Sequence, residues 1–238
     1  KKKKNINKEI KKFIEVCEDE TPNQVKLNKI LMIVLPAIII AVLALCLIGI
    51  NRTFYFNVLK VVIIINLLLA FLNMQKSTSI LLPIGDFYKN IKVYENIFKE
   101  IDKQDFESSY LKELKEGLNK DGGSLKAIKE LKKIGSYIDL RQNFVANIIL
   151  NAIVLWDFYC IDMFDKWKKS YGKNIRTYLE IVGEIEALIS LASITYVRDD
   201  YTFAKVNECD DLKPEIDFKN LKHPLIKIED AVGNGITL

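Results

Sequence analysis

The chain has 238 residues, of which 50% are hydrophobic and 28% are charged, and its formal net charge is +4. The apolar fraction excludes a disordered chain, and 10 glycines and 5 prolines are too few for a sandwich, a barrel or a Gly-rich nucleotide fold. The basic excess lies at the N-terminal end, because residues 1–29 hold nine lysines and five acids whereas residues 76–238 are net acidic. This distribution argues against a phosphate-binding surface in the folded part.

Residues 30–50 form an apolar run of 21 residues without a charge. A helix of that length crosses about 30 Å of hydrocarbon. A short turn at Arg52 leads to a second apolar run, residues 54–72, which is interrupted by Asn57, Lys60 and Asn66. The two runs predict a membrane hairpin, and the alternative, supported by the polar residues of the second run, is a buried hairpin in a soluble core.

Lysines lie on both outer flanks of the hairpin, whereas its turn offers only Arg52. By the positive-inside rule both termini are predicted to be cytoplasmic, with residues 30–72 in contact with the membrane. The lysine-rich start of the chain has two interpretations: it contacts anionic headgroups, or it is a solvated tail that only fixes topology. The flanking lysines are Lys1 to Lys4, Lys8, Lys11, Lys12, Lys26, Lys29, Lys76, Lys89 and Lys92.

Amphipathic helices are predicted after the hairpin. Apolar residues spaced by three and four predict one stripe from Phe87 to Ile101, another helix over 106–118 and a third stripe from Leu125 to Ile138. Ser124 is a candidate N-cap for the third helix. A last helix is predicted over residues 174–197, and prolines and glycines beyond it indicate extended structure and turns.

Residues 143–167 differ from the other helical segments because their centre is apolar nearly all round. This pattern predicts a central buried helix. A third membrane span is the alternative, since residues 144–161 contain one charge, Asp157. Asparagines repeat every four residues from Asn143 to Asn151, and amides are costly in lipid without partners, so the buried helix is favoured.

No catalytic motif is found in the sequence. The pair Gly172-Lys173 lacks the first glycine and the hydroxyl residue of a phosphate loop. Glu180 and Glu184 share a helix face and are interpreted as a solvated or partner-facing strip rather than an acid–base site. His223 is the single histidine, so the sequence offers few ligands for a metal site and few bases for a catalytic pair. The cysteines, which are far apart and predicted to be reduced structural thiols, are Cys17, Cys46, Cys160 and Cys209.

Five short strings follow one another through the last hundred residues. They are Leu155–Cys160, Lys166–Gly172, Gly183–Ala192, Tyr201–Phe203 and Leu221–Ile226. In this order they resemble the segment just upstream of the ATPase domain in the MutS family of DNA mismatch-repair ATPases, particularly its membrane-anchored bacterial relatives. The resemblance covers residues 139–238 and extends less specifically over residues 80–138.

The resemblance implies a helical core and lever region followed by a nucleotide-binding domain that opens at His223-Pro224. ATP and magnesium would bind beyond Leu238, and the chain is expected to be a fragment of a longer protein, an expectation that fails if the gene ends there. A homodimer is implied for the full-length protein, and DNA is a partner by resemblance alone, because no Phe-x-Glu mismatch-reading element is present. His223 is a candidate nucleotide neighbour, although a surface turn before a strand is its favoured role.

The predicted fold class is therefore all-α: a two-helix membrane hairpin, a long-helix core and lever bundle, and a short extended C-terminal segment. The predicted domains are a basic tail (1–29), the hairpin (30–75), the helical core and lever (76–204) and a linker with the start of a truncated ATPase domain (205–238). The predicted function is the non-catalytic anchor and lever of a MutS-like ATPase. A stand-alone membrane-anchored scaffold that binds another protein is the alternative.

Overall fold

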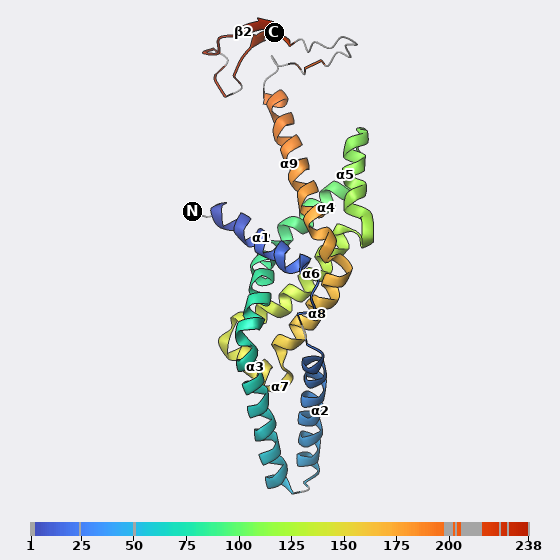
Figure 1. Cartoon of the computed structure of the whole chain (residues 1–238), viewed down its shortest axis with the longest axis vertical. Coiled ribbons are helices and arrows are strands. Elements are labelled where there is room, and N and C mark those ends of the chain that lie inside the picture. Colours follow the sequence, from blue (N-terminus) through green and yellow to red (C-terminus); the bar gives the residue numbers. More distant parts are fainter. Residues whose placement is uncertain are drawn as a thin grey trace. The chain divides into compact units, whose positions relative to one another are not determined.

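The computed structural model describes residues 3–23, 25–49, 51–197, 202, 204–205, 216–223, 225–227 and 229–237, and long helices dominate them (Figure 1). The α-helices are α1 (Lys3–Glu18), α2 (Lys26–Ile48), α3 (Arg52–Tyr88), α4 (Ile91–Lys103), α5 (Ser109–Asn119), α6 (Ser124–Asp139), α7 (Phe144–Val154), α8 (Trp156–Tyr171) and α9 (Ile175–Val197). The short 3-10 helices are η1 (Lys120–Gly122), η2 (Leu140–Gln142) and η3 (Gly172–Asn174), and the strands are β1 (Asp217–Leu221) and β2 (Asn234–Thr237). The predicted all-α fold with a short extended C-terminal segment is confirmed.

The chain divides into two units, residues 1–182 and residues 183–238. The first unit holds α1 to α8 and the start of α9. The second holds the rest of α9 and the antiparallel pair β1 and β2, in which Asp217 lies opposite Thr237. The predicted domain boundary at residue 205 stays a prediction, because residues 206–215 lie outside the described part of the chain.

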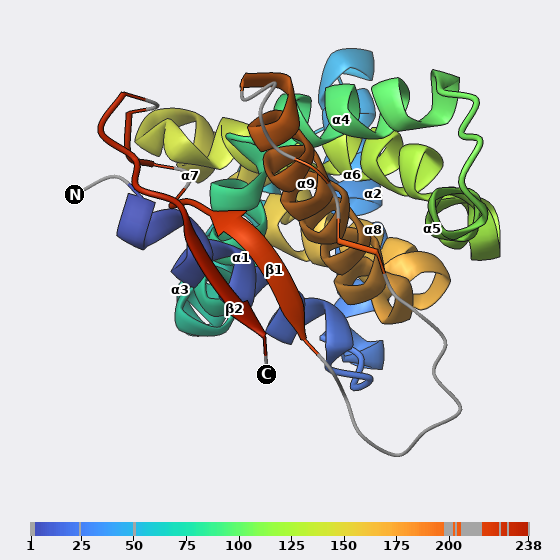
Figure 2. The same cartoon turned by 90° about the horizontal axis from the view of Figure 1, so that it is seen from above.

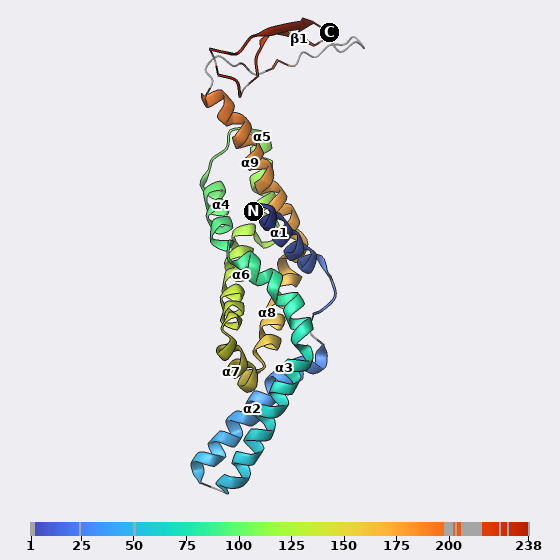
Figure 3. The same cartoon turned by 90° about the vertical axis from the view of Figure 1, so that its left-hand side faces the viewer.

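The hairpin consists of α2 and the first part of α3, which lie side by side (Figures 1 and 3). Both helices are long and apolar enough to cross a membrane. With 23 residues, α2 is about 35 Å long. It ends at Gly49, whose φ of 88° is the left-handed conformation that favours glycine at a helix C-terminus. The predicted hairpin is confirmed, and membrane association follows from it.

The second hairpin helix continues far beyond the apolar run, through Pro83 to Tyr88. The predicted single stripe from Phe87 to Ile101 is wrong in this respect, because the chain turns after Tyr88 and α4 begins at Ile91. On a straight helix two residues seven positions apart are about 10 Å apart along the axis. The turn brings the rings of Phe87 and Tyr94 to a stacked separation of 5.1 Å.

The N-terminal segment predicted as a basic tail contains a docked helix. The side chain of Phe13 on α1 is fully buried, and its ring stacks on Phe87 at a centroid separation of 4.1 Å. Cys17, one turn later, is also buried, and Arg176 pairs with Glu18. Both flanks of the hairpin therefore belong to the same folded unit.

A methyl group at Gly172 would collide with the end of α1. It would lie 2.6 Å from the carbonyl oxygen of Cys17 and 2.9 Å from Cγ of Lys168. We expect Gly172→Ala to lower the free energy of unfolding by about 1–3 kcal/mol, measured by dodecyl sulfate titration in mixed micelles. Gly183→Ala is the matched control, because nothing lies within 4 Å of its added methyl, and it is expected to be neutral or stabilising by up to about 1 kcal/mol. Equal losses in both variants would contradict the close approach at Gly172.

Helix α6 forms the centre of the first unit, where it contacts α3, α4 and α8; seen from above, α4 and α8 flank it (Figure 2). Four members of its predicted stripe are buried: Ile128, Leu131, Ile134 and Ile138. The prediction that Ser124 is the N-cap is wrong. Gly123 holds that position with a φ of 80°, and Ser124 is the first helical residue. On α8, the indole N–H of Trp167 donates to the carbonyl oxygen of Ala127 at 2.9 Å.

Glu95 on α4 accepts two ion pairs, one from Lys132 on α6 and one from Lys99 on α4 itself. Hydrogen bonds of 2.6 Å from Lys132 and from Lys99 lower the pKa of Glu95 from 4.5 to about 2. Because the folded pKa lies below the unfolded one, this stabilisation is complete above about pH 4.5 and is lost as the pH falls towards 2. We therefore expect the melting temperature in detergent to fall more steeply over this interval in the unaltered protein than in Glu95→Gln. Parallel profiles by circular dichroism would refute the assignment.

Candidate functional site at the membrane junction

The predicted buried helix over residues 143–167 is broken where the hairpin meets the rest of the first unit. Leu155 has a φ of 52°, its N–H donates to the carbonyl oxygen of Asn151, and α7 and the helix that follows are bent by 83°. The prediction of one central buried helix is wrong for α7, where Phe144 is 76% exposed. It holds for α8, whose Phe158 and Phe164 are buried.

A buried ion pair lies at this break. The guanidinium Nε of Arg141, on η2, donates to both carboxylate oxygens of Asp157 at 3.1 Å, and its Nη2 donates to the hydroxyl of Thr78 on α3 at 2.7 Å. The side chain of Asn151 accepts from the backbone N–H of Asp157 at 3.0 Å. One network thus joins α3, α7 and α8, and it satisfies the charge of Asp157 at the first turn of α8.

A second ion-pair cluster fixes the start of α2 on α8. The carboxylate of Asp162 pairs with Lys29 at 3.2 Å and with Lys166 at 2.7 Å. Burial raises the pKa of Asp162, but the hydrogen bonds from Lys166 and Lys29 outweigh it, and the pKa lies below its ordinary value. Asp162 is therefore charged at neutral pH, and its pair with Lys29 holds the start of α2 on α8.

The connection between α1 and α2 is also held by α8. Asp165 accepts from the side-chain amide of Asn23 at 2.8 Å. The ammonium of Lys168 donates to the carbonyl oxygen of Thr21 at 3.0 Å. Because Asp165 and Lys168 are both buried, these contacts hold the segment before the hairpin against the core.

Tertiary contacts explain the presence of Asn66 in the second apolar run. It is fully buried, and its Nδ2 donates to the carbonyl oxygen of Ala152 at 2.7 Å. The last carbonyls of a helix have no partner within that helix. Asn66 on α3 therefore satisfies one such carbonyl at the end of α7 and attaches α7 to the hairpin.

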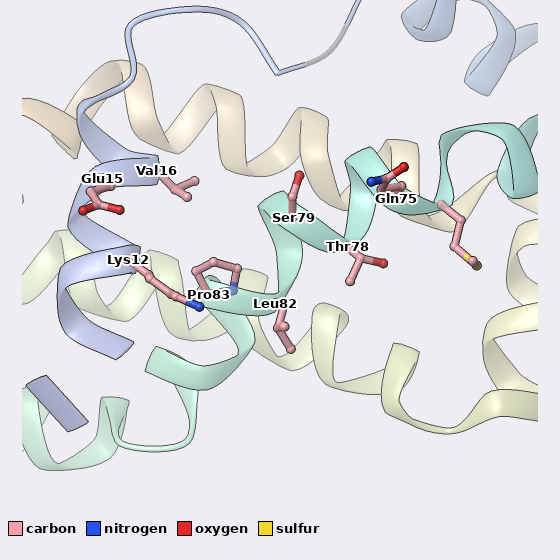
Figure 4. A pocket seen from close by; sticks show the side chains of 9 residues that line it. Lys12, Glu15, Val16, Gln75, Thr78, Ser79, Leu82 and Pro83 are labelled. Atoms are coloured by element: carbon pink, nitrogen blue, oxygen red, sulfur yellow. The ribbon is translucent and has the colours of Figure 1, made fainter. Parts of the chain in front are cut away.

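An open pocket of about 730 Å³ lies between α1 and the part of α3 that follows the apolar run in sequence (Figure 4). Lys12, Glu15 and Val16 line it from α1. Its walls from α3 are Met74, Gln75, Thr78, Ser79, Leu82 and Pro83. The nine lining residues include one ammonium, one carboxylate and two hydroxyl groups, and the hydroxyl of Ser79 donates to the carbonyl oxygen of Lys76 at 2.8 Å.

The predicted site residues are distributed along the chain. His223 is exposed, follows β1, and accepts a hydrogen bond on Nδ1 from the backbone N–H of Leu225 at 3.2 Å, which is the geometry of a turn residue. Cys17 and Cys160 are buried, and burial raises the pKa of both thiols. Cys209 lies outside the described residues. Within the described part of the chain, no group of three or more His, Cys, Asp or Glu side chains could hold a metal ion.

Of the five strings that suggest a MutS-like chain, the first two lie mainly on α8 and the third lies on α9. Leu155–Cys160 forms the α7–α8 corner, Lys166–Gly172 ends α8, and Gly183–Ala192 lies on α9. Leu221–Ile226 covers the end of β1 and the following turn, apart from Pro224, which is not among the described residues. Tyr201 and Phe203 are likewise outside them. The first two strings therefore supply residues, such as Asp157 and Lys168, that form contacts at the membrane junction, where the hairpin meets α7 and α8.

Sequence reasoning missed the partners of this junction. Asp157 was recognisable as a lone charge in an apolar segment. Arg141, which neutralises it, and Thr78, which accepts a hydrogen bond from Arg141, carry no local signal. Lys29 was predicted only as a topology signal, and its pairing with Asp162 depends on the tertiary fold. A search of protein-family models, of curated proteins and of solved structures finds no match to the chain.

Proposed function

We propose that this chain is a membrane anchor that holds a helical domain at the cytoplasmic surface. The observation that carries the proposal is the attachment of an exposed apolar hairpin to the helical domain. Lys29 on α2 pairs with the buried carboxylate of Asp162 on α8, and Thr78 on α3 accepts a hydrogen bond from Arg141. A membrane anchor that is joined to its domain by a flexible linker needs no ion pairs or hydrogen bonds with that domain. Here α2 and α3 continue directly into the folded unit, so a displacement of the helical domain is transmitted to the hairpin.

The proposed orientation places both termini in the cytoplasm. Its support is the excess of lysine on the two flanks and the docking of α1 on the unit that follows the hairpin, which requires both flanks to share one side. Labelling of intact cells with a membrane-impermeant maleimide tests it in a background carrying Cys46→Ala and Cys209→Ala. We expect Thr53→Cys in the first turn of α3, next to the hairpin turn, to react from outside, and Lys103→Cys on α4 to react only after permeabilisation. The reverse pattern refutes the orientation.

We further propose, from the resemblance of residues 139–238 to MutS-like ATPases, that the helical domain is the lever of such a protein. ATP-driven changes in a following domain would reach DNA or a partner through α9, moving as a rigid body. The test is the gene beyond the codon for Leu238. A Gly-x4-Gly-Lys-Ser/Thr motif there is expected, and an open reading frame that continues without one refutes this part of the proposal.

A second candidate is a scaffold that binds another protein. It is favoured by exposed apolar side chains on the last turns of α9, of which Leu191 is 64% and Tyr196 90% exposed. A partner captured by the full chain and lost in Leu191→Glu, together with no ATP binding by the full gene product, would support the scaffold over the lever.

A further inference from the structure

Helix α7 presents an apolar face outward. It has 11 residues and no charged side chain. Five of its apolar side chains are between 40% and 76% exposed, and we call them the outer face of α7: Phe144, Val145, Ile148, Ile149 and Ile153. Asn151 and Ala152, by contrast, are buried. A helix that turns an amide inward and large apolar side chains outward has the inverse of the pattern expected in water.

The position of α7 beside the hairpin supplies a reason for this inversion. Its C-terminal end is bound to α3 by the hydrogen bond from Asn66 to Ala152, and it lies alongside α3 in two views (Figures 1 and 3). The step from Asn66 to Leu72, the end of the apolar run, corresponds to about 9 Å along a helix. Interfacial helices bury their apolar face about 5–10 Å into the headgroup–acyl boundary.

The two hairpin helices that α7 contacts also expose apolar side chains. Phe71 and Leu72 on α3 are 69% and 68% exposed, and Ile30 at the start of α2 is 58% exposed. These side chains belong to the runs that cross the membrane, so the lipid that covers them extends to α7. A water-facing outer face of α7 would add to an apolar patch far larger than soluble proteins expose.

Aromatic side chains flank α7 at its C-terminal end. The indole N–H of Trp156 donates to the carbonyl oxygen of Tyr137 at 3.0 Å, and its ring stacks on Tyr159 at 5.9 Å. Tyr159 is 46% exposed. Tryptophan and tyrosine with one apolar and one polar end are typical of the membrane–water boundary.

We infer that α7 is an interfacial helix, embedded parallel to the bilayer surface with its outer face covered by lipid; this rests on the proposed membrane anchor. A third crossing does not fit, because 11 residues span only about 16 Å of the roughly 30 Å hydrocarbon, and the 83° bend ends the segment. The hairpin alone would anchor the chain, whereas hairpin and α7 together fix its tilt on the membrane.

Site-directed spin labels on the full chain test the inference in vesicles of phosphatidylcholine and phosphatidylglycerol. The labelled variants are Val145→Cys and Ile149→Cys on the outer face of α7, with Leu43→Cys in the hairpin and Val93→Cys on α4 as controls. All four native side chains are at least 45% exposed, so the labels replace surface residues. The background carries Cys46→Ala and Cys209→Ala, and a sample without added cysteines measures labelling of the buried Cys17 and Cys160.

The measured quantity is the ratio of collision rates with oxygen, which concentrates in lipid, and with a water-soluble nickel chelate. We expect the ratio at both α7 positions to exceed that at Val93 several-fold and to remain below that at Leu43. A ratio equal to that at Val93 places α7 in water, one equal to that at Leu43 indicates a third crossing, and weak collisions with both reagents indicate cover by protein, such as a second copy. Each of these three results overturns the inference. A water-like ratio at Leu43 itself refutes the hairpin anchor instead.

Discussion

Replacement of Arg141 by methionine is expected to lower the free energy of unfolding by about 3–5 kcal/mol. The variant removes the guanidinium that donates to both oxygens of Asp157 at 3.1 Å and to Thr78 at 2.7 Å. The side chain of Asp157 is only 6% exposed, so its charge would stay buried without a cation. Dodecyl sulfate titration in mixed micelles, followed by circular dichroism, measures the loss.

Lys103→Met is the matched control for this variant. Lys103 pairs with Glu100 on α4 at 2.8 Å, but both side chains are 65% exposed. An ion pair in water contributes about 1 kcal/mol or less, so the control is expected to unfold almost as the unaltered protein does. Similar losses in Arg141→Met and Lys103→Met would contradict the role given to the Asp157 network at the membrane junction.

Replacement of Phe13 by alanine is expected to release α1 from the helical domain. Its ring is fully buried and stacks on Phe87 at 4.1 Å, with Trp167 at 6.4 Å. Loss of a buried phenylalanine costs about 3–5 kcal/mol, so α1 is expected to detach more often in this variant. Trypsin cleavage after Lys11 and Lys12, followed by mass spectrometry, should accelerate strongly in detergent.

Phe71→Ala is the control for α1 release, because Phe71 is 69% exposed on the hairpin. Its cleavage rate at Lys11 and Lys12 is expected to equal that of the unaltered protein. An unchanged rate in Phe13→Ala would mean that α1 does not depend on this contact, and would remove the support that both hairpin flanks share one side of the membrane.

Hydropathy and periodicity predicted the hairpin and most helices correctly because these signals are local. An uncharged run of 21 residues has few stable environments other than a membrane or a large core. Four of the five members of the stripe from Leu125 to Ile138 are buried because their spacing matches one face of a helix. The predicted helix over residues 174–197 is likewise observed as α9, starting at Ile175.

Helix breaks were predicted poorly because they depend on tertiary contacts. Nothing in the local sequence distinguishes Leu155 as a left-handed residue, since neither glycine nor proline marks the break. The break is held by Asn151, Asp157 and Arg141, which is distant in sequence from Asp157. The turn after Tyr88 is similar, because it places Phe87 between the rings of Phe13 and Tyr94.

The sequence analysis overestimated the burial of α7, because an apolar helix is stable both in a protein core and at a lipid boundary. The pattern of residues 144–154 fits a protein core and a lipid boundary, and only the structure shows that Phe144 and Val145 are exposed beside the hairpin. The polar interruptions were the useful signal. Asn66 and Asn151, which weakened the membrane interpretation, are the residues that attach and close α7.

The most direct test of the account measures whether the full chain is an integral membrane protein. Cell membranes that contain the chain are washed with alkaline carbonate and then solubilised with detergent, and each fraction is quantified by immunoblot. The account predicts that the chain stays in the carbonate-washed pellet and is released by detergent. Release of the chain into the carbonate supernatant would show that α2 and α3 do not cross a bilayer and would contradict the membrane anchor.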